Sequence, residues 1–394
     1  MNSRLFFCIL IMALVATGCV SEFNAHLPPN ATQILIIDGA IIENTEALFR
    51  ISRSFSMDAY GIPDSSFVND AILTLIGSNG YKSPAAIHQG KGAYRISVGK
   101  LEEDVEYGIE IIYNEETYQS ALSKPLHTPE IDSVTWVQPE KKGAVSFQVY
   151  THDDITESKF YAWHYSEDWE IEAEIPTRIF LDWAGLDFFT TNSAPNYYCW
   201  KKSETDGFVF GTTESLKENR IVHQPLYQCA ASDERFSILY SVTVTQKTIS
   251  KGAYEYYQNR KKMNEEMGGL FTPQPSELAG NIQCVTNPSK KVIGYVETHK
   301  NISQKRTFVH WYQITRDWPN RDCPTILHKD MASHFGPNMT FSDYYKMGMR
   351  PAGDADPVYY PDIIPARWAS VYCTDCTANG GSKSKPVFWP NNHE

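Results

Sequence analysis

Cys19 is the residue whose type and position point most directly to a chemical reaction. It follows an apolar run from Leu5 to Val15, which Arg4 precedes and the small residues Ala16-Thr17-Gly18 close. These are the three parts of an export signal with its cleavage site. A cysteine directly after that site is typical of a bacterial lipobox, so we expect its thiol to carry a diacylglycerol. The alternative is an ordinary signal peptide with a chance cysteine.

Lipidation would divide the beginning of the chain into two functional segments. We expect residues 1–18 to be a lipoprotein signal peptide and residues 19–31 to be a tether to the membrane. The apolar run is shorter than the ~20 residues that a spanning helix needs, which favours a lipid anchor. Val20-Ser21-Glu22 holds a single acid, so a surface-exposed and a periplasm-facing position on the outer membrane both stay open.

Six further cysteines remain in the exported chain, and they allow up to three disulfides. Cys373 and Cys376 have the CxxC spacing that also occurs in redox and zinc sites. Gly380-Gly381 and Pro386 follow them, so no helix is expected there, and the chain has no second CxxC. We therefore predict structural disulfides, for example between Cys323 and one of this pair. The candidate residues are Cys199, Cys229, Cys284, Cys323, Cys373 and Cys376.

Signatures of catalysis are missing from the sequence. It has no Gly-x-Ser-x-Gly elbow, no His-Glu-x-x-His, no Walker loop and no Gly-x-Gly-x-x-Gly. Asp354, Asp356 and Asp362 could offer oxygen ligands to calcium, but the glycine and glutamate of an EF-hand loop are missing. We expect no enzyme, no metal and no cofactor, with an envelope hydrolase as the alternative.

Aromatic residues gather at two places where they could stack against a sugar or a peptide. Neighbours such as Tyr359 and Tyr360 cannot both face a core if they lie in a strand, because successive side chains point to opposite faces. Packing in a core is the competing interpretation for the whole group. The candidate platform residues are Tyr197, Tyr198, Trp200, Tyr359 and Tyr360.

One short motif could direct a modification. Asp132-Ser133-Val134 fits the Asp-Ser/Thr-apolar pattern that bacteria of the Bacteroidetes type use for O-glycosylation, which makes Ser133 a candidate acceptor. A plain polar linker explains the same three residues.

Composition narrows the classes of partner. The formal net charge is −12 and no basic block occurs, which argues against nucleic acid and against attraction to anionic lipid. Aromatic residues make up 13% of the chain, a bias that suits strands better than helices.

Short strands are predicted along the first third of the chain. In the segment 47–55, Phe49 and Ile51 alternate with Arg50 and Ser52. Further strands are expected over residues 33–42, 71–76, 92–98 and 105–122. Strands at this spacing predict an all-β sandwich or barrel, and the tyrosine pattern resembles Ig-like and transthyretin-like (carboxypeptidase regulatory-like) sandwiches. We predict this sandwich over residues 32–125.

A linker is expected over residues 126–134, since Pro125 and Pro129 mark a boundary. A larger β-rich domain should follow over residues 135–394. It holds one notable helix, predicted at about 250–267, with Ser250 as its N-cap and Gly268-Gly269 as its stop. The last 60 residues look irregular and tied down by cysteines.

The second half of the chain carries the motifs of a known family. They are Tyr240–Gln246, Ala253–Tyr257, Gly268–Pro275, Gly280-Asn281-Ile282, Asn287-Pro288, Val292–Tyr295, Cys373–Cys376, Gly380-Gly381, Lys385-Pro386 and Phe388-Trp389. In this order they resemble the Bacteroidetes outer-membrane lipoproteins classed as domain of unknown function 4249. Members are commonly encoded beside TonB-dependent receptors. The resemblance implies an accessory lipoprotein of such a receptor and offers no catalytic residues to carry over.

Three functions are compatible with these features. The first is a lipid-anchored binding partner of a TonB-dependent receptor in nutrient capture or uptake, with a glycan or peptide as ligand. The second is a structural or adhesion lipoprotein without a small ligand, and the third is the hydrolase. We expect no nucleic-acid partner.

Overall fold

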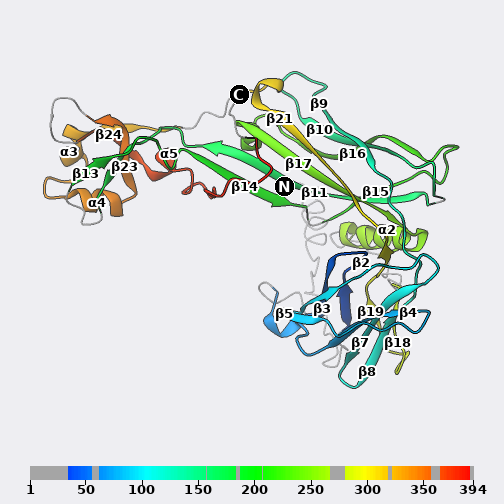
Figure 1. Ribbon diagram of the computed structural model, residues 1–394. Coiled ribbons are helices and arrows are strands. Elements are labelled where there is room, and N and C mark those ends of the chain that lie inside the picture. Colours follow the sequence, from blue (N-terminus) through cyan, green and yellow to red (C-terminus); the bar gives the residue numbers. More distant parts are fainter. Residues whose placement is uncertain are drawn as a thin grey trace, which may run out of the picture.

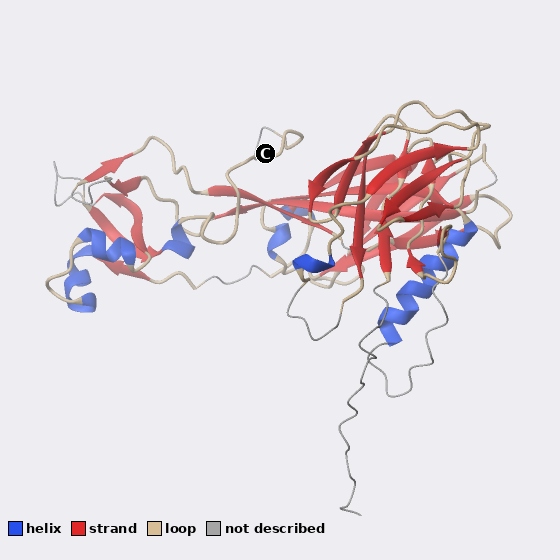
Figure 2. Ribbon diagram, turned by 90° about the horizontal axis from the view of Figure 1, so that it is seen from below, coloured by secondary structure: helices blue, strands red, loops and turns tan. Residues whose placement is uncertain are grey.

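The computed structural model describes residues 34–55, 62–156, 158–182, 187–205, 207–266, 280–317, 322–355 and 364–390. Strands prevail in these residues and the helices are few, which confirms the all-β fold class (Figure 2). The strands build two β-sandwiches and a smaller module, and the three parts follow one another in a bent arrangement (Figure 1). None of the described helices is long and apolar enough to cross a membrane.

The first sandwich consists of a five-stranded and a four-stranded sheet. One sheet has the order β19 (Val292–Ile293), β1 (Leu35–Asp38), β3 (Glu46–Arg53), β6 (Ala93–Ser97) and β5 (Ile87–Gly90). The other has the order β18 (Ile282–Cys284), β8 (Glu116–Ser120), β7 (Tyr107–Tyr113) and β4 (Ile72–Gly77). Strand β3 alternates as its sequence predicts, with Phe49 and Ile51 fully buried and Arg50 exposed.

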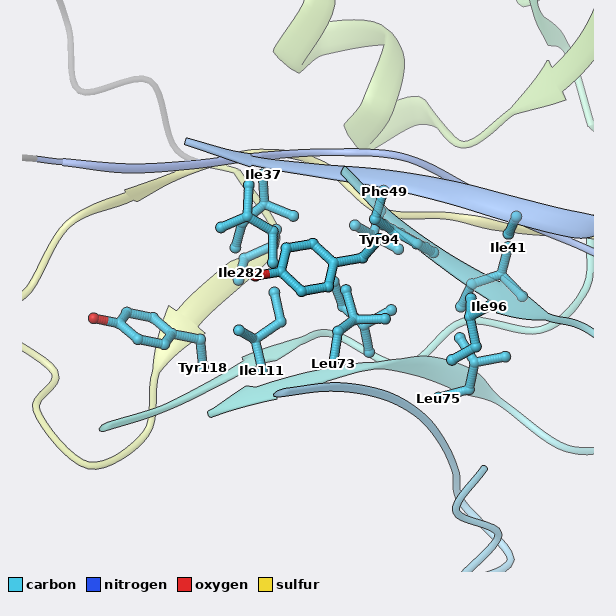
Figure 3. Packing of buried hydrophobic residues seen from close by; sticks show 14 of the residues in the cluster. Ile37, Ile41, Phe49, Leu73, Leu75, Tyr94, Ile96, Ile111, Tyr118 and Ile282 are labelled. Atoms are coloured by element: carbon cyan, nitrogen blue, oxygen red, sulfur yellow. The ribbon is translucent and has the colours of Figure 1, made fainter. Parts of the chain in front are cut away.

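The core of the first sandwich lies between the inner faces of its two sheets (Figure 3). Phe49 and Tyr94 come from one sheet, and Leu73 and Ile111 come from the other. The Tyr94 hydroxyl donates a hydrogen bond to the Val68 carbonyl at 3.0 Å. The buried tyrosine therefore adds apolar area without leaving a polar atom unpaired.

Residues from 280 onward belong partly to this first sandwich, whereas the sequence placed them in the second domain. Strand β18 pairs antiparallel with β8, and β19 pairs parallel with β1. These strands have only three and two residues. Their local pattern is too short to show which sheet they join, because that choice rests on pairing with residues far away in the sequence.

The second sandwich packs a three-stranded sheet on a five-stranded one. The smaller sheet has the order β16 (Arg220–Cys229), β10 (Val145–His152) and β9 (Ile131–Val137). The larger has the order β14 (Tyr198–Glu204), β11 (Phe160–Glu172), β17 (Leu239–Ile249) and β21 (Ser303–His310), and β15 (Val209–Thr212) also pairs with β11. Phe147, Trp163 and Tyr240 lie in the core between them.

The predicted linker 126–134 is shorter than expected, since residues 131–134 already form the start of β9. The buried side chain of Gln246 explains why the segment before β9 is held in place. Gln246 accepts a hydrogen bond from the Trp163 indole at 2.7 Å and donates one to the Pro129 carbonyl at 2.9 Å. The core of the second sandwich thus holds the segment that leads into it.

Helix α2 (Lys251–Glu266) confirms the predicted helix in the described residues. The Ser250 hydroxyl accepts a hydrogen bond from the Ala253 amide at 3.1 Å and so caps its first turn. Ala253 and Tyr257 cover Phe160 and Ile249 on the larger sheet of the second sandwich. The helix lies where the two sandwiches meet (Figure 1). Parallel pairing of β2 (Ile41–Ile42) with β20 (Thr298–His299) also joins them there.

The distal module is built from the remaining described elements. Its strands are β12 (Ile179–Leu181), β13 (Phe188–Thr190), β22 (Thr325–Leu327), β23 (Met349–Ala355) and β24 (Pro365–Ser370), and its helices are α3 (Met331–Phe335), α4 (Phe341–Lys346) and α5 (Val371–Thr374). It lies at the end of the arm that β11 and β14 form (Figure 1). Trp368 is its buried centre, packed on Met331 and Tyr344.

The expectation of an irregular C-terminal segment is wrong for α4, β23, β24 and α5, whereas residues 375–390 form no strand or helix and the disulfides hold the segment as expected. The strands and helices of the distal module have three to seven residues, too few for a clear period, and Trp368 organises them through tertiary contacts. Short 3-10 helices complete the described elements: η1 (Asp64–Ser66), η2 (Glu234–Phe236), η3 (Trp311–Gln313) and η4 (His328–Asp330).

Candidate binding site

Several predicted site residues lie outside the described residues. They are Cys19, Asp356, Tyr359, Tyr360 and Asp362. Of the proposed calcium ligands, only Asp354 is described, and it lies in β23. Within the described part of the chain, no three histidine, cysteine or acidic side chains come together as metal ligands.

The cysteines form two of the three disulfides that the sequence allowed. Cys199 on β14 pairs with Cys376, and Cys323 pairs with Cys373 on α5. The two members of the CxxC motif thus have different partners, and both bonds brace the C-terminal segment, as predicted for structural disulfides. Cys229 and Cys284 are buried free thiols. Burial raises the pKa of the Cys229 thiol to about 12, so it stays protonated and unreactive at neutral pH.

The described part of the predicted aromatic platform is packed beside a disulfide. Tyr197, Tyr198 and Trp200 are each partly buried around Cys199, and the two tyrosine rings meet edge to face at 4.6 Å. Burial raises the pKa of Tyr197 to about 12. Packing explains these residues better than an open stacking surface does. Trp311 and Tyr312 on η3 are more exposed, at 44% and 60%, and sequence reasoning missed them.

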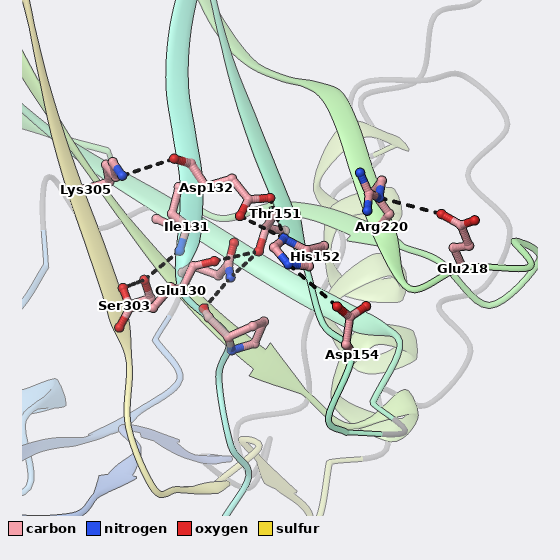
Figure 4. A network of polar contacts seen from close by, with 12 residues as sticks. Glu130, Ile131, Asp132, Thr151, His152, Asp154, Glu218, Arg220, Ser303 and Lys305 are labelled. Carbon is pink, nitrogen blue, oxygen red and sulfur yellow. Dashed lines mark hydrogen bonds and ion pairs between the residues drawn. The ribbon is translucent and has the colours of Figure 1, made fainter.

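Ser133, the candidate acceptor for a glycan, lies in β9 and is half-buried. Its neighbour Asp132 belongs to a surface network of polar contacts (Figure 4). Both carboxylate oxygens of Asp132 lie 2.8 Å from His152 Nδ1, and His152 Nε2 lies 3.8 Å from Asp154. The hydrogen bond to Asp132 raises the pKa of His152. The network fixes the edge of the second sandwich.

The clearest candidate for a ligand site is a polar groove in the first sandwich, with a cavity of about 420 Å³. That volume falls in the range of small-molecule sites. It lies at the end of the sandwich where β7 turns into β8, away from helix α2 and the second sandwich (Figure 1). The lining residues are Ile34, Leu35, Arg53, Tyr113, Asn114, Glu116, Tyr118, Asn287, Ser289, Lys290 and Lys291.

Two distant segments supply the charges of the polar groove. Arg53 ends β3, while Lys290 and Lys291 lie in the loop between β18 and β19. That loop turns back on itself through a hydrogen bond from the Lys290 amide to the Asn287 carbonyl at 3.0 Å. A bond from the Thr117 amide to the Thr286 hydroxyl fixes it to β8 at 3.1 Å.

Glu116 is the acid among the lining residues. It accepts hydrogen bonds from Lys290 Nζ and from the Tyr118 hydroxyl, both at 2.7 Å. The bond from Lys290 lowers the pKa of Glu116, so the carboxylate is charged at neutral pH. The charged lining residues are Arg53, Lys290 and Lys291 against Glu116, a formal sum of +2 in a chain of net charge −12. The groove can therefore attract a small anion.

Sequence reasoning missed this site because it searched for basic residues that lie close together in the chain. Arg53 and Lys290 are far apart in sequence, and only the return of β18 and β19 to the first sandwich brings them together. The family resemblance had marked Asn287-Pro288 as a motif, and this was the one sign in the sequence that the loop lining the groove matters.

A second group of ionisable residues lies where the two sandwiches meet. Lys247, Glu297 and His299 line a cavity of about 30 Å³, which has room for a water molecule and no larger ligand. Burial raises the pKa of Glu297 to about 7 and lowers the pKa of His299 to about 3. Burial also lowers the pKa of Lys247. We assign this junction cluster a structural role between the sandwiches.

Comparison with known families decides the classification. The family model of a domain of unknown function (DUF4249) matches residues 20–305, which is most of the chain. The chain belongs to this family. Comparison with curated proteins finds no match.

Several residues that carry the DUF4249 resemblance have structural roles. The Asn281 side chain accepts a hydrogen bond from the Val296 amide at 2.9 Å and donates one to the Val296 carbonyl at 2.7 Å. A Cβ atom on Gly280 would lie 1.9 Å from the Gly294 carbonyl oxygen, so only glycine fits this crossing. The Tyr295 ring packs at a tilt against the Tyr256 ring of helix α2, with ring centroids 5.5 Å apart. These motifs join the return strands to the junction.

Proposed function

We propose that this DUF4249 chain is a lipid-anchored outer-membrane lipoprotein of the Bacteroidetes type, and that it acts as an accessory or binding partner of a TonB-dependent receptor in nutrient capture or uptake. The family resemblance and the lipobox at Cys19 support this proposal. It treats the protein as a binding module rather than as an enzyme.

The observation that carries the proposal is the position of the distal module, which lies far from the point where the described chain begins (Figure 1). The described chain begins at Ile34 beside the polar groove, at the free end of the first sandwich. Fourteen residues lie between Cys19 and Ile34, and they reach at most about 50 Å when extended. A lipid at Cys19 would keep the first sandwich near the membrane. The second sandwich and the distal module would then project toward a partner (Figure 1).

Co-purification from source membranes tests this function. A tag after Glu394 allows the protein to be recovered in mild detergent, and mass spectrometry identifies what accompanies it. We expect a TonB-dependent receptor in stoichiometric amount. Recovery of the chain alone would contradict the partnership and favour a free-standing structural or adhesion lipoprotein.

A matched variant separates anchoring from partnership. Cys19→Ala removes the thiol that would be acylated and leaves all described residues unchanged. We expect this variant to leave the membrane fraction, because two or three acyl chains supply the anchor. If the variant stays in the membrane as wild type does, Cys19 is not the anchor.

A further inference from the structure

We propose that the polar groove of the first sandwich is a phosphate-binding site, and that a phosphorylated lipid headgroup of the anchoring membrane occupies it. The proposal rests on the proposed function only for the source of the phosphate, because it is the lipid anchor that would bring the groove to the membrane. The groove itself is defined by its described residues.

The cations of the groove offer donors that suit a phosphate. Arg53 donates through Nη2 to the Ser65 carbonyl, which uses one of the five N–H donors of its guanidinium. Guanidinium groups bind phosphate oxygens with paired, charge-assisted hydrogen bonds. Lys290 Nζ carries three donors, and the bond to Glu116 uses one of them.

The charge distribution favours a single phosphate over a larger polyanion. The groove has a formal charge of +2, whereas the whole chain has −12. A nucleic acid would meet that negative surface along its length. The composition argues against a general attraction to anionic lipid, but a single headgroup would feel mainly the groove, since charges more than about 8 Å away are largely screened at physiological salt. The site therefore selects compact anions.

The place of the groove points to a lipid as the source. Ile34 and Leu35, the first described residues, line its wall, so a chain anchored through Cys19 would hold the groove within about 50 Å of the bilayer. Tethering raises the effective concentration of headgroups at the site, and even a weak site would then be occupied. Binding would orient the first sandwich on the membrane.

Vesicle binding by the chain from Val20 to Glu394 tests the proposal. This chain keeps every described residue and lacks Cys19, so its binding depends neither on lipidation nor on a receptor. We expect it to sediment with vesicles that contain phosphatidylglycerol or phosphatidic acid and not with pure phosphatidylcholine. Added salt or free inorganic phosphate should release it.

Charge-removing variants locate the site. Arg53→Gln and Lys290→Gln should each weaken binding to the acidic vesicles by about fivefold or more, as expected for the loss of a charge-assisted contact. Lys141→Gln removes the same charge from an exposed position on the second sandwich and should bind as wild type does. Since Arg53 also donates to the Ser65 carbonyl, the melting curve of Arg53→Gln is compared with that of wild type. The side chain of Lys290 is 45% exposed, so Lys290→Gln is less prone to disturb the fold.

Three results would overturn the proposal. Absence of binding to acidic vesicles and to inorganic phosphate would show that the polar groove does not bind phosphate. Binding of inorganic phosphate alone, lost in Lys290→Gln, would exclude the lipid headgroup and leave a soluble phosphate as the ligand. An equal loss in Lys141→Gln would show a diffuse surface effect. A failed co-purification with a receptor would leave each of these results unchanged.

Discussion

Burial of Glu297 at the junction makes the stability of this protein depend on pH, and buried His299 beside it, whose pKa is lowered to about 3, contributes with the opposite sign. Glu297 is 6% exposed, and its carboxylate accepts a hydrogen bond from the Ser250 amide at 2.8 Å. Lys247 lies with its ammonium 5.8 Å from the centre of the Phe208 ring. Burial disfavours the charged forms of both groups. The junction cluster therefore favours the protonated form of Glu297.

Glu297→Gln should remove the contribution of Glu297 to this pH dependence. The pKa of Glu297 is raised from 4.5 to about 7 in the folded state, so its stabilising contribution is complete below about 4.5 and is lost as the pH rises through 7. The loss amounts to roughly 3 kcal/mol at 1.36 kcal/mol per pKa unit. Glutamine keeps the acceptor for Ser250, and we expect the variant to lose less stability than wild type between pH 5 and pH 8. Urea unfolding across this range measures the difference.

Glu110 supplies a control of opposite sign. A hydrogen bond from Lys82 lowers the pKa of Glu110, so its contribution is present above the unfolded pKa and is lost as the pH falls. Glu110→Gln should therefore be less stable than wild type at neutral pH, with a gap that closes in acid. Identical pH profiles for wild type and Glu297→Gln would contradict the assignment at the junction.

At the scale of elements, the return strands β18 and β19 complete the first sandwich and depend on a close crossing of backbones. Gly280 and Gly294 meet there, and the Asn281 amide donates to the Gly294 carbonyl at 3.2 Å. A strand that joins a sheet so far from its sequence neighbours needs fixed points, and these contacts supply them. A side chain at the crossing would separate the two segments.

Gly280→Ala tests that crossing. The added Cβ would lie 1.9 Å from the Gly294 carbonyl oxygen, so the backbone must move, and overpacking of this kind costs about 1–3 kcal/mol. Gly99→Ala is the matched control, because nothing lies within 4 Å of its added Cβ. We expect a lower urea midpoint for the first variant and almost no change for the second. Equal midpoints would show that the return strands are not fixed at this crossing.

The same elements show how far the sequence could predict the fold. Phe49 and Ile51 alternate in a strand of eight residues, and Ser250 precedes a helix of sixteen, so both elements could be predicted from local pattern. Strands of two or three residues, such as β19 and β18, carry no such pattern. The polar groove needs those strands in place before Arg53 meets Lys290. The family was thus open to sequence reasoning and the candidate site was not, while the lipid anchor predicted at Cys19 stays a prediction.

At the scale of the whole molecule, two sandwiches and the distal module lie in a bent line rather than around one core. The described core residues form separate clusters in the first sandwich, the second sandwich and the distal module. The disulfides Cys199–Cys376 and Cys323–Cys373 brace the arm and the module at its end. An arrangement of this kind buries less surface than one compact domain, and under the proposed function it would hold a partner surface away from the anchor.

Small-angle X-ray scattering tests this arrangement in solution. A compact domain of the 376 residues from Cys19 to Glu394 would have a radius of gyration of about 21 Å. The bent line of modules should give a clearly larger value and an asymmetric distance distribution. A value near 21 Å would mean that the distal module folds back on the sandwiches. The geometry that carries the proposed function would then be lost, because the distal module would no longer project away from the membrane. If the larger value persists across salt concentrations, the shape is set by the packed junction and the disulfides rather than by repulsion among the chain's excess negative charges.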